Sequence, residues 1–151
     1  MNNFKDTYNT YYKLVYRLAF KFLGDHENAA DITQDVFLHL YSQLKLKGEV
    51  YNTKAWLYKV TTNLCKTFLN KTRRIAKHEY EKPAADVTDN EKNIEVVEAL
   101  KKMNKRDRIL LTLYSEDISY KKMAEITGIK FTSIGKTLSR ALKKLKHEME
   151  S

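Results

Sequence analysis

Apolar side chains recur every three to four residues along most of the chain, which is the spacing of one face of an α-helix. The first half contains three such stretches, and none has the strict alternation of a strand, so an all-α fold is expected. Asn52 or Thr53 is suited to cap the third stretch. The predicted core faces are Tyr12, Val15, Tyr16, Ala19, Phe22 and Leu23; Ile32, Val36, Phe37, Leu40 and Leu44; and Ala55, Val60, Leu64 and Phe68.

The second half ends in a pattern typical of a helix-turn-helix. Met123 and Ile126 give a short helix an inward face, and Gly128 supplies the chain reversal that a tight turn between helices needs. A longer helix follows and runs into a basic tail. Its predicted inward face is Ile134, Leu138, Ala141, Leu142 and Leu145.

The helical pattern breaks once, between about residues 82 and 93. This stretch holds the single proline, Pro83, with Asp, Asn and Thr and almost no large apolar residue, as is typical of a linker. The sequence therefore predicts two small helical domains, at residues 1–75 and 96–151, joined by a flexible acidic linker at residues 76–95.

Charge is unevenly distributed around this linker. The chain of 151 residues has a formal net charge of +9. Residues 1–80 hold 13 Lys and Arg against 7 Asp and Glu, residues 81–95 hold 2 against 5, and residues 96–151 hold 13 against 7. Two basic lobes favour polyanion binding through two surfaces, although high net charge also serves solubility, and composition alone leaves both open.

Other classes of protein find little support. A lone cysteine, Cys65, excludes an intramolecular disulfide, the N-terminus lacks a leader pattern, and no apolar run approaches the roughly 20 residues of a membrane span, so we expect a cytoplasmic protein without direct membrane insertion. We expect neither a metal site nor a cofactor, because the histidines lack nearby ligands at metal spacing. These histidines are His26, His39, His78 and His147.

Polar residues on the predicted outer face of the helix-turn-helix suit the phosphates and base edges of a major groove. An ordinary helical hairpin with a solvated lysine face is the alternative. The outward-facing residues are Lys130, Thr132, Ser133, Lys136, Ser139, Arg140 and Lys143.

Two further surfaces lie in the first half. The outer face of the second helix is acidic and is either solvated or a dock for a basic protein surface, which its residues alone leave open. The third helix interleaves rings, amides and cations, which suits stacking on unpaired bases, although Trp56 is also suited to a core. The acidic face comprises Asp31, Gln34, Asp35 and Leu38; the third helix offers Trp56, Tyr58, Lys59, Thr62, Asn63, Lys66, Asn70, Lys71, Arg73 and Arg74.

Taken together, these segments resemble the bacterial RNA polymerase sigma factors of the extracytoplasmic-function (ECF) group, built from sigma domains two and four. The resemblance covers nearly the whole chain, and the order of its motifs is more specific than any one of them. The motifs are Leu23-Gly24-Asp25, ADITQDVFLHLY, KAWLYKVTTNL with a basic end, an acidic linker, and ISYKKMAEITGIKFTSIGKTLSRALKKL.

The resemblance implies a role for each surface and a monomeric protein without enzymatic activity. Its partners would be core RNA polymerase, promoter DNA and, by family habit, an anti-sigma factor. The acidic face of Asp31, Gln34, Asp35 and Leu38 would dock on the polymerase clamp. The minus-ten element would be bound by Trp56, Tyr58, Lys59, Asn63, Lys66, Lys71, Arg73 and Arg74, and the minus-thirty-five element by Lys130, Thr132, Ser133, Lys136, Thr137, Arg140 and Lys143.

Departures from the family pattern fall on the DNA-reading surfaces, so the promoter sequence is not transferable. The usual Val-Lys-Ser-Arg of the recognition helix is Ile134-Gly135-Lys136-Thr137 here. Thr137 lacks the guanidinium that pairs with guanine. Gly135 costs about 1 kcal/mol in a helix relative to alanine, and a close backbone approach to DNA is one reason for it. Lys130 stands where a serine is common, which leaves Thr132 or Ser133 as the expected helix cap.

Two alternative functions remain. A stand-alone helix-turn-helix transcriptional regulator that never joins polymerase accounts for the second half only, and such proteins usually dimerise. A nucleic-acid enzyme would need clustered carboxylates or a histidine acid–base pair, and the sequence offers neither.

Overall fold

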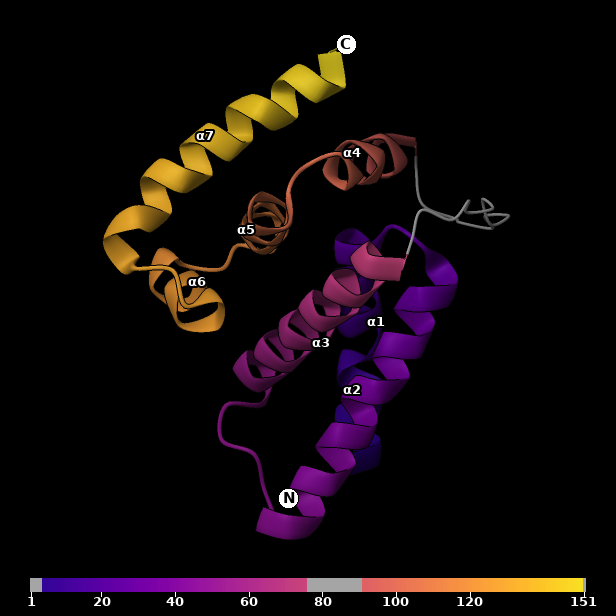
Figure 1. Ribbon diagram of the computed structural model, residues 1–151. Helices are drawn as coiled ribbons and strands as arrows, with labels where there is room; N and C mark the ends of the chain where they lie inside the picture. Colours follow the sequence, from indigo (N-terminus) through magenta and orange to yellow (C-terminus); the bar gives the residue numbers. More distant parts are fainter. Residues whose placement is uncertain (1–3, 76–90, 151) are drawn as a thin grey trace. The chain divides into compact units, whose positions relative to one another are not determined.

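The computed structural model describes the backbone of residues 4–75 and 91–150 and the side chains of residues 4–71 and 94–150 (Figure 1). Within these ranges the chain forms seven α-helices and no strand, so the predicted all-α fold is confirmed. The helices are α1 (Phe4–Leu23), α2 (His26–Lys47), α3 (Thr53–Ile75), α4 (Glu91–Lys101), α5 (Lys105–Ser115), α6 (Tyr120–Thr127) and α7 (Phe131–Glu150).

The chain divides into two compact units, Met1–Pro83 and Ala84–Ser151. Helix α4 begins at Glu91, so the second helical unit starts within the range predicted as linker, while residues 76–90 of that range lie outside the described residues. No described helix combines the length and the apolar character that a membrane span requires.

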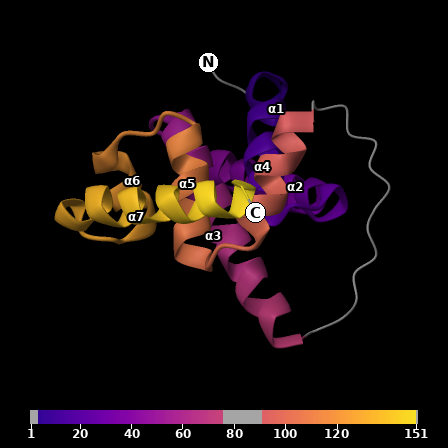
Figure 2. The same cartoon turned by 90° about the horizontal axis from the view of Figure 1, so that it is seen from above.

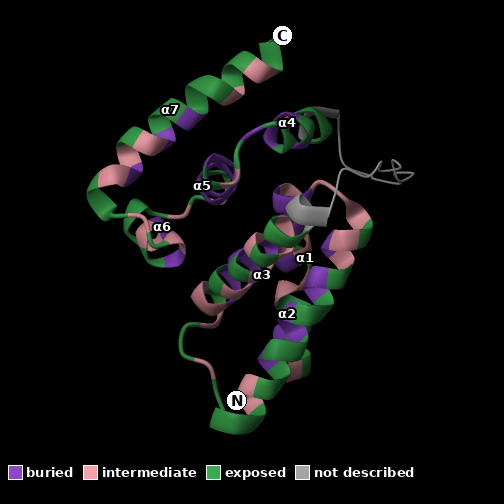
Figure 3. Ribbon diagram, in the orientation of Figure 1, coloured by how far each residue is buried: buried purple, intermediate pink, exposed green. Residues whose placement is uncertain are grey.

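In the first unit, α1 packs against both α2 and α3, and α2 also contacts α3 (Figure 1). Buried and exposed residues alternate along α2 with the helical period (Figure 3). The predicted core faces of the first two helices are largely confirmed. The residues buried on these helices include Val15, Leu18, Ala19, Phe22 and Leu23 of α1 and Ile32, Val36, Phe37 and Leu40 of α2.

The predicted core face of the third helix is wrong. Ala55, Val60, Leu64 and Phe68 are only partly buried. The buried stripe of α3 runs one position away and includes two threonine hydroxyls, which a search for large apolar residues assigns to the surface. Its members are Leu57, Tyr58, Thr61, Thr62 and Cys65.

Short polar segments end and restart the helices of the first unit. Asp25 caps α2 by accepting a hydrogen bond from the backbone N–H of Glu27 at 3.2 Å. Asn52 precedes α3, and its side-chain oxygen accepts from the N–H of Ala55 at 3.3 Å. Of the two residues predicted to cap this helix, Asn52 is therefore the one that does so.

In the second unit, α7 packs against α4, α5 and α6. Figure 2 looks down on α7, which crosses α5 with α6 beside it. Gly128 ends α6 in the left-handed conformation at φ 83°, and its N–H donates to the carbonyl of Ala124 at 2.8 Å. This is the predicted reversal between the two helices. The buried core includes Leu110, Leu113, Met123, Ile134 and Leu138.

The expected cap of α7 at Thr132 or Ser133 is wrong. Helix α7 starts at Phe131, so both residues lie inside its first turn and Lys130 stands directly before it. The N–H of Ser133 donates to the carbonyl of Lys130 at 2.8 Å, so a backbone turn begins this helix.

Candidate docking and nucleic-acid surfaces

One side of α2 presents the four residues predicted for docking. Asp31, Gln34, Asp35 and Leu38 are all exposed, and their spacing of three, one and three residues places them on one face. Leu38 is 64% exposed. The face therefore combines two carboxylates with an apolar side chain, and the opposite, buried face of α2 fixes its position.

An aromatic cluster beside this face was missed in the sequence. Phe4 and Tyr8 of α1 pack against Phe37 and Tyr41 of α2, with ring centroids 4.9 Å apart for Tyr8 and Phe37 and 5.5 Å apart for Phe4 and Tyr41. Edge-on ring contacts of this kind stabilise a helix pair beyond the area they bury. The signal was the spacing of Phe4, Tyr8 and Tyr12 four residues apart.

Helix α3 presents part of the predicted minus-ten set on one face. Trp56, Lys59, Asn63 and Lys66 follow one another at spacings of three, four and three residues. Lys59 and Asn63 are exposed, whereas Trp56 and Lys66 are partly buried. An amide and two cations therefore lie beside an indole ring on a single helical face. Lys71 is exposed further along the helix.

The remaining members of that set do not join this face. Tyr58 is only 5% exposed and belongs to the buried stripe of α3, so the structure separates it from Asn63. Its sequence position between Leu57 and Lys59 did not reveal this burial. Arg73 and Arg74 lie on the backbone of α3, but their side chains lie outside the described residues.

Tyr51, in the turn before α3, was also missed. Its side chain is 93% exposed, and it is followed directly by the capping residue Asn52.

Helix α7 presents a basic face. Thr132, Lys136, Arg140 and Lys143 are exposed and follow one another at spacings of four, four and three residues, opposite the buried Ile134, Leu138 and Ala141. Ser133 and Thr137 lie at the margin of this face and are partly buried, and Lys130 is exposed in the turn before it. The structure thus brings the predicted minus-thirty-five residues together on one side of the second unit.

Beyond this face, α7 is tied to the start of α5 by a buried carboxylate. Asp107 is 1% exposed, and its carboxylate accepts hydrogen bonds from Lys144 Nζ at 3.4 Å, Arg106 Nη2 at 3.2 Å and Asn104 Nδ2 at 3.2 Å. Asn104 caps α5 in return by accepting from the N–H of Asp107 at 2.9 Å. Because Asp107 stands among cations in the sequence, it was expected to be solvated, and its burial was not predicted.

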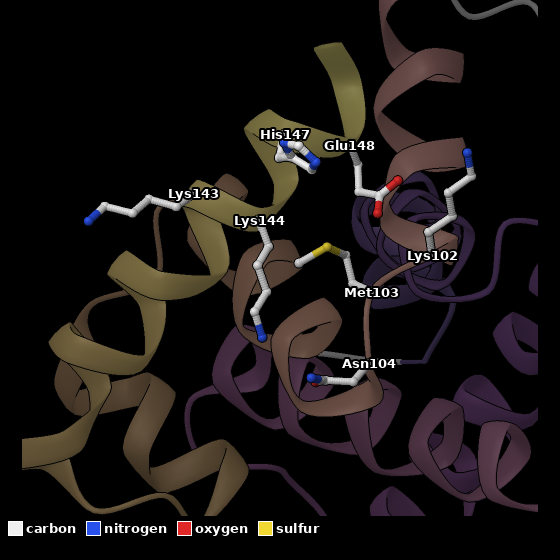
Figure 4. A pocket seen from close by; sticks show the side chains of 7 residues that line it. All are labelled: Lys102, Met103, Asn104, Lys143, Lys144, His147 and Glu148. Carbon is white, nitrogen blue, oxygen red and sulfur yellow. The ribbon is translucent and has the colours of Figure 1, made fainter. Parts of the chain in front are cut away.

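An open pocket of about 410 Å³ lies next to this link. Figure 4 shows the side chain of Lys144 directed toward Asn104 and that of Lys143 directed away from the pocket. The lysines therefore do not converge on a common point. The lining residues are Lys102, Met103, Asn104, Lys143, Lys144, His147 and Glu148.

Comparison with known proteins finds two families along the chain. The family described as Sigma-70 region 2 matches residues 7–75, and the family described as Sigma-70, region 4 matches residues 93–145. The first match spans α1, α2 and α3, and the second covers nearly all of the second unit. Together they define the class of the protein as a sigma factor.

Curated proteins similar to this chain are also RNA polymerase sigma factors. RNA polymerase sigma factor SigV of Bacillus subtilis (strain 168) is 28% identical over 89% of this chain and 83% of its own length. RNA polymerase sigma factor YlaC of the same organism is 25% identical over 98% of this chain and 92% of its own. ECF RNA polymerase sigma factor SigE of Mycolicibacterium smegmatis is 25% identical over 87% of this chain and 56% of its own.

A solved structure has the same fold. The sigma factor RpoE from Bartonella quintana, in complex with the anti-sigma factor NepR, matches with a TM-score of 0.77 at 19% identity over 97% of this chain and 96% of that one. The chain therefore belongs to the sigma-70 family, in the ECF group of RNA polymerase sigma factors. Such a protein binds core RNA polymerase and directs promoter recognition and transcription initiation.

Proposed function

We propose that this sigma factor docks on core polymerase through the α2 face of Asp31, Gln34, Asp35 and Leu38. The observation that carries the proposal is an exposed acidic face that ends in an exposed leucine, in a chain of net charge +9. Complementary charge steers association, and a desolvated apolar side chain near the centre supplies affinity. The adjoining Phe4–Tyr41 ring contact keeps α2 fixed against α1, so little order has to be gained on docking.

Co-elution with sigma-free bacterial core polymerase tests this docking face. The Asp31→Lys, Asp35→Lys double variant is expected to lose co-elution that the wild type shows. Glu49→Lys is the matched control, because Glu49 is an exposed carboxylate that lies after α2. Equal retention of both variants would contradict the docking face. A wild type that fails to bind core polymerase from its own host, yet shifts DNA as a dimer, would instead identify a stand-alone helix-turn-helix regulator.

For α3 we propose binding of the unpaired minus-ten element through Asn63, Lys59 and Lys66, with Trp56 bracing the face. Extruding a base costs a few kcal/mol of stacking, so an amide to bind its edge and cations to bind the backbone are both needed. Asn63→Ala in the polymerase complex is expected to slow promoter opening while duplex binding persists. Lys71, Arg73 and Arg74, which follow in the sequence of α3, are proposed to add further positive charge to this interface.

For α7 we propose binding of the minus-thirty-five element as duplex DNA. Lys136, Arg140 and Lys143 would supply phosphate and base-edge contacts, with Lys130, Thr132, Ser133 and Thr137 around them. The partial burial of Ser133 and Thr137 limits them to short contacts at the margin. A footprint of the polymerase complex that ends downstream of the minus-thirty-five element would contradict this assignment.

We also propose that the protein acts as a cytoplasmic monomer without catalytic activity and is held inactive by an anti-sigma factor. Its structural relative is a sigma factor bound to one, which supports this partner. The expected result is a second protein of its host that removes purified sigma factor from core polymerase in a competition assay. If no host protein displaces the sigma factor from core polymerase, the proposed inhibition by an anti-sigma factor is contradicted, while the sigma function is not.

A further inference from the structure

The aromatic cluster of Phe4, Tyr8, Phe37 and Tyr41 is only partly covered by the protein itself. Phe37 is 3% exposed, whereas Tyr8 is 38% and Tyr41 is 48% exposed. The ring centroids of Tyr8 and Phe37 lie 4.9 Å apart, and those of Phe4 and Tyr41 lie 5.5 Å apart. The cluster therefore holds α1 against α2 and at the same time presents two of its rings to solvent.

Tyr41 connects this cluster to the exposed side chain of Leu38. It follows Leu38 by three residues and Phe37 by four, so it lies between them on the surface of α2. Phe4 in turn contacts the rings of both Tyr8 and Tyr41. Leu38, Tyr41 and Tyr8 thus form one exposed apolar strip, which crosses from α2 onto α1.

The other side of Leu38 is polar. Phe37 and His39 flank Leu38 on opposite sides, because each residue turns a helix by about 100°. His39 and Ser42 are both exposed, and His39 Nδ1 is hydrogen-bonded to the backbone carbonyl of Asp35 at 2.9 Å. A partner that covers Leu38 therefore buries more aromatic surface only if it extends toward α1.

Charged residues lie at both ends of the strip on α2. Asp31 and Asp35 precede Leu38 on the same face, and Lys45 follows with its Nζ 5.5 Å from the centroid of the Tyr41 ring. An exposed apolar patch with a polar border is typical of a protein-binding site, and tyrosine is frequent among the residues that dominate binding energy. The two carboxylates disfavour a polyanion and favour a protein that places basic residues beside apolar ones.

We propose that core polymerase covers the apolar strip together with the acidic face, so that its docking site crosses from α2 onto Tyr8 of α1. The strip is continuous with the proposed docking face through Leu38, and the inference rests on that proposed face. Burial of the two exposed rings supplies an apolar part of the affinity, whereas Asp31 and Asp35 supply a charged part. Contacts within the cluster already hold both rings, so little order has to be gained on binding.

Binding of the full chain to sigma-free core polymerase from its host tests the strip. Tyr41→Ala and Tyr8→Ala are each expected to raise the Kd roughly tenfold. His39→Ala is the control for Tyr41→Ala, because it removes an exposed ring from the opposite side of Leu38. Thr10→Ala is the control on α1, because Thr10 is exposed and does not share a face with Tyr8. Each control is expected to change the Kd less than about twofold.

A salt series separates the two parts of the docking site. The loss of affinity in Tyr8→Ala is expected to be the same at low and high salt, because the burial of a ring is not screened by ions. The loss in the Asp31→Lys, Asp35→Lys double variant is expected to shrink as salt rises. A Tyr8→Ala loss that disappears at high salt would overturn the apolar contact.

Hydroxyl-radical footprinting of the wild type avoids variants that fold poorly. Oxidation of Tyr8 and Tyr41 is expected to fall several-fold when core polymerase binds. Unchanged oxidation of Tyr8 in the assembled complex would overturn the inference. Protection of Tyr8 that develops in the free protein as its concentration rises would assign the strip to a second copy of the chain and would overturn it as well.

The acidic face and the apolar strip can fail separately in these experiments. If the Asp31→Lys, Asp35→Lys variant loses polymerase while Tyr8→Ala and Tyr41→Ala bind as their controls do, only the inference fails. If the double variant retains polymerase, the proposed docking face fails and the inference fails with it.

Discussion

The exposed faces of α2 and α7 are built alike, but they differ in the sign of their charge and in whether an apolar residue lies among the polar ones. Each lies opposite a buried apolar face, as on any amphipathic helix. The α2 face is short, carries Asp31 and Asp35, and has Leu38 within it, whereas the α7 face extends from Lys136 to Lys143 and its exposed charges are all positive. An exposed apolar residue beside two carboxylates suits a protein partner, and a row of cations suits a polyanion. The partners proposed for the two faces therefore differ because the surface chemistry of the faces differs, not because the helices are built differently.

The largest effect is expected from reversing charge on α7. Lys136→Glu, Lys143→Glu replaces two attractions to phosphates with two repulsions, so DNA affinity should fall by roughly 100-fold at low salt. The slope of log affinity against log salt should decrease by about 2 in magnitude. Fluorescence anisotropy with a labelled duplex over a salt series measures both. Unchanged affinity would remove α7 from the DNA interface.

Leu38→Ala separates apolar anchoring from charge on α2. If Leu38 is buried on docking, its loss costs about 1 to 2 kcal/mol, or roughly tenfold in the Kd for core polymerase. Stability of the free protein should not change, because this side chain is already exposed. Leu46→Ala is the control, since Leu46 is 78% exposed on the same helix and outside the docking face. Equal losses of polymerase affinity in the two variants would show that Leu38 is not a specific anchor of the docking face.

Asp107→Ala tests whether the basic face depends on the link between α5 and α7. The substitution removes the buried carboxylate to which Asn104 and Lys144 donate. The free energy of unfolding of the second unit, measured by chemical denaturation, is expected to fall by about 1 to 3 kcal/mol. Glu98→Ala breaks an ion pair whose two side chains are both exposed and should cost well under 1 kcal/mol. A loss for Asp107→Ala no larger than for this control would make the link dispensable.

The smallest effect concerns Gly135→Ala. Alanine favours helix over glycine by about 1 kcal/mol, and its methyl group makes an ordinary contact with the Tyr120 ring. The variant should therefore be slightly more stable than the wild type while binding duplex DNA equally well. Lower stability in thermal unfolding would show that even a methyl group displaces the ring.

The amphipathic pattern predicted the parts of the fold where large apolar residues face inward. Ile32 and Val36 of α2 and Ile134 and Leu138 of α7 are buried as their spacing indicates. The pattern failed for α3, where the hydroxyls of Thr61 and Thr62 share the buried stripe, because residue type alone does not show which polar groups a helix buries.

The same distinction applies to the candidate surfaces: exposure was predictable from the sequence, and contacts between distant residues were not. Asp35 and Lys136 were predicted to face outward and do so, since exposure follows from the helical period. The burial of Tyr58 and Asp107 and the contact of Tyr120 with Gly135 depend on neighbours distant in sequence or on another helix. No local pattern specifies such contacts. The roles of the exposed residues in binding stay predictions.

A crossed binding experiment tests the division of labour between the two faces most directly. Affinities for core polymerase and for duplex DNA are measured for the wild type, for Asp31→Lys, Asp35→Lys and for Lys136→Glu, Lys143→Glu. The account predicts that the α2 variant loses polymerase and retains DNA, and that the α7 variant loses DNA and retains polymerase. Retention of polymerase by the α2 variant, or loss of both ligands in either variant while it remains folded, would contradict the account.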